Sequence, residues 1–212
     1  MIDLLKIDAW NDYEKSYFWK NNRTMNKKNN IIIATIFILI AAASRLLPHP
    51  PNFTPLGGMA LFGAAYLGRK YWTLLIPLIA FLVSDFILNN TLYSSYAEGS
   101  GLVFFTKNQI FTAIAFIAIA LIGSRILRKI KPVNVLAASF IASVAFFLIS
   151  NFGVWMTWSL FGDGVGGLLA TYLAGIPFFW NTFAGDLFYS VALIGGFELY
   201  RYMQMKRSEV RV

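Results

Sequence analysis

The sequence predicts an all-α integral membrane protein with six transmembrane helices and with both termini in the cytoplasm. Of its 212 residues, 58% are hydrophobic and only 13% are charged, and its mean hydropathy is +0.60. Soluble domains are usually about half apolar and about a quarter charged. Several stretches with no charge or a single charge have about the length that crosses a hydrocarbon core of about 30 Å. Such stretches must satisfy their backbone polar groups internally, which favours helices.

The distribution of positive charge supports six spans and orders them across the membrane. The expected spans cover residues 31–47, 55–68, 71–89, 108–127, 133–152 and 178–200. With an internal N-terminus, 16 of the 18 lysines and arginines fall in the two tails and the two internal loops, and only Arg45 and Lys107 do not. Because basic residues concentrate in cytoplasmic segments, this pattern predicts a multi-pass protein of the bacterial inner membrane. It also accounts for the net charge of +8 without nucleic-acid binding.

Three parts are expected along the chain. Residues 30–200 form the six-helix membrane domain, and residues 201–212 form a basic cytoplasmic tail. Residues 1–29 form an N-terminal segment that is either cytoplasmic or lies on the membrane surface, since residues 1–24 mix polar and aromatic side chains. Met25 then begins a basic flank that is typical of an inner-membrane protein.

With this topology, the polar residues within and beside the spans gather on the outer side. Ionisable groups inside a span are costly and usually face a cavity or a partner group. We therefore expect an outward-facing ligand pocket, covered by the proline-rich first outer loop and by the third outer loop, which is rich in tryptophan and glycine. The expected substrate-binding residues are Arg45, His49, Asn52, Asp85, Asn89, Asn151, Trp155, Trp158, Asn181 and Asp186.

Structural roles are the alternatives for several of these residues. Asp85 is equally expected to pair with Arg45 and to hold two helices together. Asn151 is better explained as a helix end-cap, His49 as a hydrogen-bonding loop residue, and the two tryptophans as interfacial anchors. Asp186 lies deeper and has no cation in its own half of the span, which favours a functional role.

The second expected span is rich in small residues. Ala60, Ala64 and Gly68 form a stripe with a spacing of four that allows close approach of another helix. Packing within the chain is the favoured explanation, and docking of a partner subunit is the alternative. Residues 59–68 also resemble residues 166–175, which suggests a short re-entrant or interfacial helix at 165–176, as in transporters with related halves.

The composition excludes several kinds of chemistry. The chain has no cysteine and one histidine, so disulfides, thiolate nucleophiles and sites rich in cysteine or histidine are excluded. It has no GxxxxGK[ST] loop, so energy would come from a partner ATPase, or transport would be facilitated. An intramembrane enzyme that uses Asp85 and Asp186 as a carboxylate pair is the weakest hypothesis. We expect no enzyme activity, no catalytic residue, no cofactor and no metal.

Three strings resemble an uncharacterised bacterial membrane family, namely RLLPHPPNFTPLGGMALFGAAYLG, NFGVW and IPFFWNTFAGDLFYS. That family is in turn similar to the substrate-binding S components of energy-coupling-factor (ECF) transporters. The resemblance spans about residues 31–200. It implies six helices, a vitamin-sized pocket near the outer face, and an energising membrane subunit with ATPases as a partner. S components often carry a small-residue stripe on the first helix for docking that subunit, but here Ile38 interrupts it.

The leading hypothesis is therefore a membrane-embedded binding and uptake protein for a small, vitamin-like molecule. The alternative is a structural or scaffold subunit of a membrane complex, of the cell-shape type, that binds no ligand. The lipid bilayer surrounds the protein in both cases.

Overall fold

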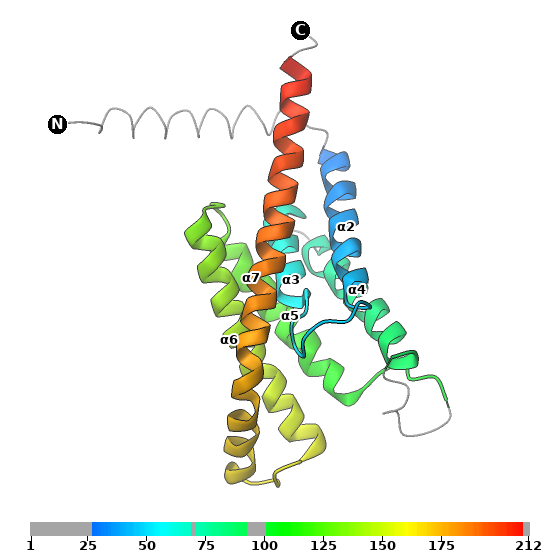
Figure 1. The fold of residues 1–212 in the computed structure, drawn as a ribbon, viewed down its shortest axis with the longest axis vertical. Coiled ribbons are helices and arrows are strands. Elements are labelled where there is room, and N and C mark those ends of the chain that lie inside the picture. The colour runs from blue at the N-terminus through cyan, green and yellow to red at the C-terminus, as the bar shows by residue number, and fades with distance from the viewer. Residues whose placement is uncertain (1–26, 69–70, 93–100, 210–212) are drawn as a thin grey trace, which may run out of the picture.

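The computed structural model describes residues 27–68, 71–92 and 101–209, and all regular secondary structure within them is helical (Figure 1). The helices are α2 (Lys27–Ser44), α3 (Leu56–Tyr66), α4 (Trp72–Asn90), α5 (Lys107–Ile126), α6 (Pro132–Trp158) and α7 (Val165–Glu209). Helices α4, α5 and α6 are long and apolar enough to cross a membrane, and α2 and α3 are shorter and also apolar. The structure thus confirms the all-helical fold and the membrane-type character of the chain. The exact number of spans, the orientation of the termini and the nature of residues 1–24, which lie outside the described ranges, stay predictions.

The last helix corrects one prediction. Residues 165–176 do not form a separate re-entrant helix, because they are the first turns of α7, which continues through Pro177 to Glu209. At a rise of about 1.5 Å per residue, its 45 residues extend for about 67 Å. Figure 1 shows α7 running along the whole bundle and beyond the other helices at its C-terminal end. A proline can be retained inside such a helix, since neighbouring groups satisfy the carbonyl oxygen that it leaves unpaired.

Helix α3 lies at the centre of the bundle and contacts each of the other described helices. Its residues 56–63 are all buried. Its glycines permit the close contacts: a Cβ atom at Gly58 would lie 2.6 Å from Cβ of Tyr189 in α7, and one at Gly63 would lie 2.7 Å from Cγ of Pro77 in α4. Helices α4 and α7 therefore both pack closely against the backbone of α3.

The predicted stripe of small residues serves packing within the chain. Ala60 is completely buried and has no surface to offer a partner. Ala64 faces α5, since a Cβ atom at Gly123 would lie 3.0 Å from its methyl group. Gly68 follows the end of α3, is exposed and has a φ of +87°, so it stands in a turn and does not extend the stripe. Docking of a partner on Ala60, Ala64 and Gly68 stays a prediction, for which Ala60 offers no surface.

Candidate functional site

The proline-rich loop between α2 and α3 is packed against the middle of α7. The side-chain amide of Asn181 donates a hydrogen bond to the carbonyl oxygen of Pro51 at 3.0 Å. The loop backbone approaches α7 so closely that a Cβ atom at Gly185 would lie 2.9 Å from the backbone nitrogen of Thr54. The ring of Phe53 contacts two aromatic rings of α7 at centroid distances of 5.8 and 5.9 Å. The strings PHPPNFTPLGG and WNTFAGDLFYS therefore meet in one contact.

Asp186 of α7 lies at the N-terminus of α3. Its residue exposure is 2%, its carboxylate accepts a hydrogen bond from the backbone N–H of Gly57, and the hydroxyl of Ser143 in α6 donates to it at 2.7 Å. Helix α3 has Pro55 at its N-cap position and no side-chain cap of its own. A carboxylate is favourable there, because a helix N-terminus carries partial positive charge and unpaired N–H groups. Asp186 thus caps α3 from another helix and joins α3, α6 and α7.

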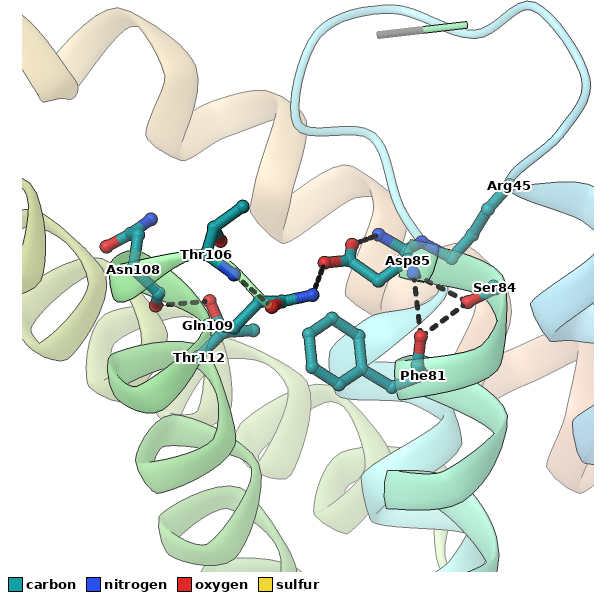
Figure 2. Close-up of polar contacts among 8 residues, drawn as sticks. All are labelled: Arg45, Phe81, Ser84, Asp85, Thr106, Asn108, Gln109 and Thr112. Carbon is teal, nitrogen blue, oxygen red and sulfur yellow. Dashed lines mark hydrogen bonds and ion pairs between the residues drawn. The ribbon is translucent and has the colours of Figure 1, made fainter. Parts of the chain in front are cut away.

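A second polar network joins the ends of α2, α4 and α5 (Figure 2). The Arg45 guanidinium forms an ion pair with Asp85, with 2.8 Å between Nη2 and Oδ1, and Nη1 donates to the hydroxyl oxygen of Ser84 at 2.6 Å. The side-chain amide of Gln109 donates to the other carboxylate oxygen of Asp85. Figure 2 shows Arg45 and Gln109 approaching Asp85 from opposite sides. The guanidinium also lies over the ring of Phe81, 5.3 Å from its centroid.

The sequence left two roles open for Asp85, ligand binding and pairing with Arg45. In the structure Asp85 pairs with Arg45. The side chains of Arg45 and Asp85 are only 8% and 16% exposed, so both charges are largely removed from water. Removing one partner of such a pair costs about 3–5 kcal/mol, because the other charge is left uncompensated. The sequence did not single out Gln109, although Thr106 and Gln109 form a capping box at the start of α5, and that spacing is visible in the sequence.

Four polar atoms near these helix ends are buried and have no hydrogen-bond partner among the described residues. They are Nε of Arg45, Nδ2 of Asn89, Oδ1 of Asn108 and Nε1 of Trp155. Asn89 follows Asp85 by one turn of α4, and Asn108 precedes Gln109 in α5. Phe111, one turn after Asn108, packs on Gly153 of α6, two residues before Trp155. Because buried polar atoms are nearly always paired, the atoms on Asn89, Asn108 and Trp155 call for a hydrogen-bonding partner that the described residues do not supply.

The other predicted residues have separate surroundings. Nδ1 of His49 lies 2.6 Å from the carbonyl oxygen of Leu47, in agreement with its alternative role in the loop. Asn52 is exposed and forms a turn with a φ of +63°, and Trp158 is exposed at the last residue of α6. Asn151 is no end-cap, because α6 continues for two more turns beyond it. Its amide nitrogen donates to a carbonyl oxygen one turn earlier, and its side chain fits against Gly175 of α7.

Five of the ten predicted residues therefore gather in two places. Asn181 and Asp186 hold α7 to the loop and to α3. Arg45, Asp85 and Asn89 lie at the ends of α2 and α4, where Gln109 and Asn108 join them from α5. His49, Asn52 and Trp158 belong to neither place.

These features define a class of protein, a helical membrane-type bundle with buried polar networks at the predicted outer ends of its helices. The chain belongs to a family of unknown function, DUF6580, whose sequence profile matches residues 25–208. No curated protein and no solved structure has significant similarity to it.

Proposed function

We propose that this protein binds a small polar molecule at the outer ends of α4, α5 and α6 and takes part in its uptake across the bacterial inner membrane. In this respect it would be similar to the S components of ECF transporters. The observation that supports the proposal is the set of buried, unpaired polar atoms on Asn89, Asn108 and Trp155. Leaving such atoms unpaired costs about 1–3 kcal/mol each, a penalty that a hydrogen-bonding ligand removes.

The chemistry of these atoms indicates the kind of ligand. The amide nitrogen of Asn89 and the indole nitrogen of Trp155 donate hydrogen bonds and therefore suit acceptor oxygens. The amide oxygen of Asn108 suits a hydroxyl or N–H group. Asp85 is already neutralised by Arg45, so the site has no free charge to attract a cation. An uncharged or weakly charged molecule that carries hydroxyl, carbonyl or amide groups fits best, and vitamins contain such groups.

The energy for uptake would come from a partner ATPase subunit, or the transport would be facilitated, because the chain has no phosphate-binding loop. The competing hypothesis is a scaffold subunit without a ligand, and it would need a partner surface that does not include the completely buried Ala60. The small residues Ala60 and Ala64 pack inside the chain, against α5 and the rest of the core.

Thermal unfolding of the purified protein with a panel of vitamins and cobamides tests the proposal. A true ligand stabilises the folded state by about 2.7 kcal/mol when its free concentration is about 100 times Kd. Asn89→Ala and Asn108→Ala should each reduce this shift. Asn134→Ala is the matched control, since that side chain hydrogen-bonds at the opposite end of α6. The absence of a shift with every compound, or an equal shift in all three variants, would count against the proposal.

A further inference from the structure

The segment before α5, residues 101–106, is not helical and exposes large apolar side chains. Leu102, Phe104 and Phe105 are 67%, 71% and 56% exposed, and Leu92, just beyond the end of α4, is also exposed. Single apolar residues are common on protein surfaces. A group of three within four residues instead indicates contact with a membrane or with a partner.

The backbone of this segment is held by the side chain of Asn90, the last residue of α4. The amide nitrogen of Asn90 donates to the carbonyl oxygen of Val103 at 2.9 Å, and the backbone N–H of Val103 donates to the amide oxygen at 2.8 Å. The same amide nitrogen donates to the carbonyl oxygen of Phe86, one turn earlier in α4, at 2.8 Å. Asn90 thus pairs both backbone polar groups of Val103 in place of water.

This pairing permits the segment to lie close to lipid. Irregular backbone is not found exposed to the hydrocarbon core, because its N–H and C=O groups would have no partners there. Asn90 supplies both partners for Val103. The backbone groups on either side still need polar surroundings, so the segment suits the boundary between headgroups and acyl chains and not the centre of the bilayer.

The apolar surface of this segment is continuous with that of the two helices beside it. Helices α4 and α5 are both long and apolar enough to cross a membrane. Each has a row of exposed apolar side chains three or four residues apart, namely Leu75, Ile79, Val83 and Ile87 on α4 and Ile110, Ile114, Ile117 and Leu121 on α5. The ring of Phe104 lies 5.2 Å from that of Phe86, next to Ile87, and so extends the row on α4.

We propose that Leu102, Phe104 and Phe105 enter the bilayer at the boundary between headgroups and acyl chains and anchor the start of α5 in the outer leaflet. Lipid fits this surface better than a protein partner, because residues 102–105 carry no polar side chain and lie between the ends of two candidate spans. Phenylalanine and leucine are typical of segments that lie in this boundary. The exposed Lys107 limits the depth, since its ammonium group must reach headgroups or water.

The anchored segment leads directly into the first turn of α5. Thr106 and Gln109 form the capping box there, and the side-chain amide of Gln109 donates to Asp85. The bilayer therefore helps to fix the end of α5 that joins the network of Arg45 and Asp85. This role does not require a small-molecule ligand.

Spin labels on single cysteines test the proposal, because the chain has no cysteine of its own. Phe104→Cys and Phe105→Cys each receive a nitroxide, and the purified protein is placed in nanodiscs of phosphatidylcholine and phosphatidylglycerol. Power-saturation EPR then compares the accessibility of the label to oxygen, which concentrates in lipid, with its accessibility to a nickel chelate, which stays in water. Ile114→Cys on the exposed face of α5 is the lipid control, and Arg128→Cys in the exposed turn after α5 is the water control.

Both labels should be more accessible to oxygen than to the nickel chelate, with a ratio between those of the two controls. Accessibility to the nickel chelate as high as at Arg128→Cys would overturn the proposal, since the side chains would then lie in water. Low accessibility to both reagents would also overturn it, since a protein contact would then cover them.

Asn90→Ala tests the part that Asn90 plays in positioning the anchor. It removes both hydrogen bonds to Val103, so the label on Phe105→Cys should become more mobile and more accessible to the nickel chelate. Asn134→Ala removes a side-chain hydrogen bond at the start of α6 and is the matched control, which should leave the label unchanged. An unchanged label in Asn90→Ala would refute the positioning role. The anchor and the proposed function fail independently, because the EPR measurement is made without any small molecule.

Discussion

Replacing Gly57 by alanine tests the contact between Asp186 and the N-terminus of α3. The new Cβ atom would lie 2.2 Å from Oδ1, 2.4 Å from Cγ and 2.6 Å from Oδ2 of Asp186. No side-chain carbon can remain at these distances, so either the carboxylate or the start of α3 must move. The side chain of Asp186 has little room to move, since it is buried and bonded to Ser143.

The expected cost has two sources. Overfilling a packed interior usually costs about 1–3 kcal/mol. Losing the hydrogen bond from Gly57 to a charged acceptor costs about 1.5–3 kcal/mol. Since alanine favours a helix by about 1 kcal/mol over glycine, Gly57→Ala should lower the free energy of unfolding by about 1.5–5 kcal/mol.

Chemical unfolding of the purified protein in detergent measures this cost. Gly195→Ala is the matched control, because it also lies in a helix and its added Cβ atom would meet nothing within 4 Å. That variant should be as stable as the wild type or slightly more stable. Adding Asp186→Ala to Gly57→Ala should cost less than the sum of the two single changes, because the added methyl group enters the space that the carboxylate leaves. A cost for Gly57→Ala within about 1 kcal/mol of the Gly195→Ala value would refute the contact.

Three further predictions follow from other contacts. Arg45→Met should lower the free energy of unfolding by about 3–5 kcal/mol, and the double variant Arg45→Met with Asp85→Leu should recover part of this loss, because no uncompensated charge remains. Gly153→Ala should cost about 1–3 kcal/mol, since its Cβ atom would lie 2.5 Å from Cγ of Phe111. Asn181→Ala should cost about 0.5–1.5 kcal/mol and should make the proline-rich loop more sensitive to limited proteolysis, because it removes the bond to the loop carbonyl. Unfolding curves that leave these variants indistinguishable from the wild type would contradict the corresponding contacts.

The sequence predicted most of the helical segments well because they are long apolar runs, and the distribution of basic residues supported the shorter α3. The sequence was less informative about the last residue of a helix that extends past its apolar run. Asn151 looked like the end of a helix because the expected span stopped at residue 152, but α6 continues to Trp158. Pro177 looked like a boundary, yet α7 passes through it. Hydropathy reports which residues suit lipid, and it does not report where a helix extends past the apolar core.

Most contacts between helices could not be predicted, because a single sequence does not show how the helices are rotated against one another. The pair Arg45 and Asp85 could be predicted because opposite charges within one half of a bilayer are few and attract each other. Asp186 had no charged partner to indicate its contact, and its neighbours are a backbone N–H and a serine hydroxyl. Gly57 lies in the second expected span, which was predicted from its many small residues to allow close helix packing, but its contact with Asp186 depends on the rotation of α3 relative to α7. Nothing in residue type or spacing fixes that rotation.

The position of the proline-rich loop could not be predicted from the sequence either. Its residues were predicted to form the rim of a pocket, and its stiffness follows directly from its prolines. In the structure the loop is held on α7 by Phe53 and by the bond from Asn181. The unpaired polar atoms that support the proposed ligand site lie instead on α4, α5 and α6, where the sequence highlighted Asn89 and Trp155 but not Asn108.

The rate at which a thiol introduced at Lys107, next to Asn108, reacts from outside the cell tests the proposed site most directly. The chain has no cysteine, so Lys107→Cys provides a single reactive group and leaves the proposed ligand-binding side chains in place. The proposed function predicts that a membrane-impermeant thiol reagent modifies it in intact cells and that a stabilising small molecule slows the reaction. Modification only from the cytoplasmic side, or a rate that no stabilising compound changes, would contradict an outward-facing ligand site at the start of α5.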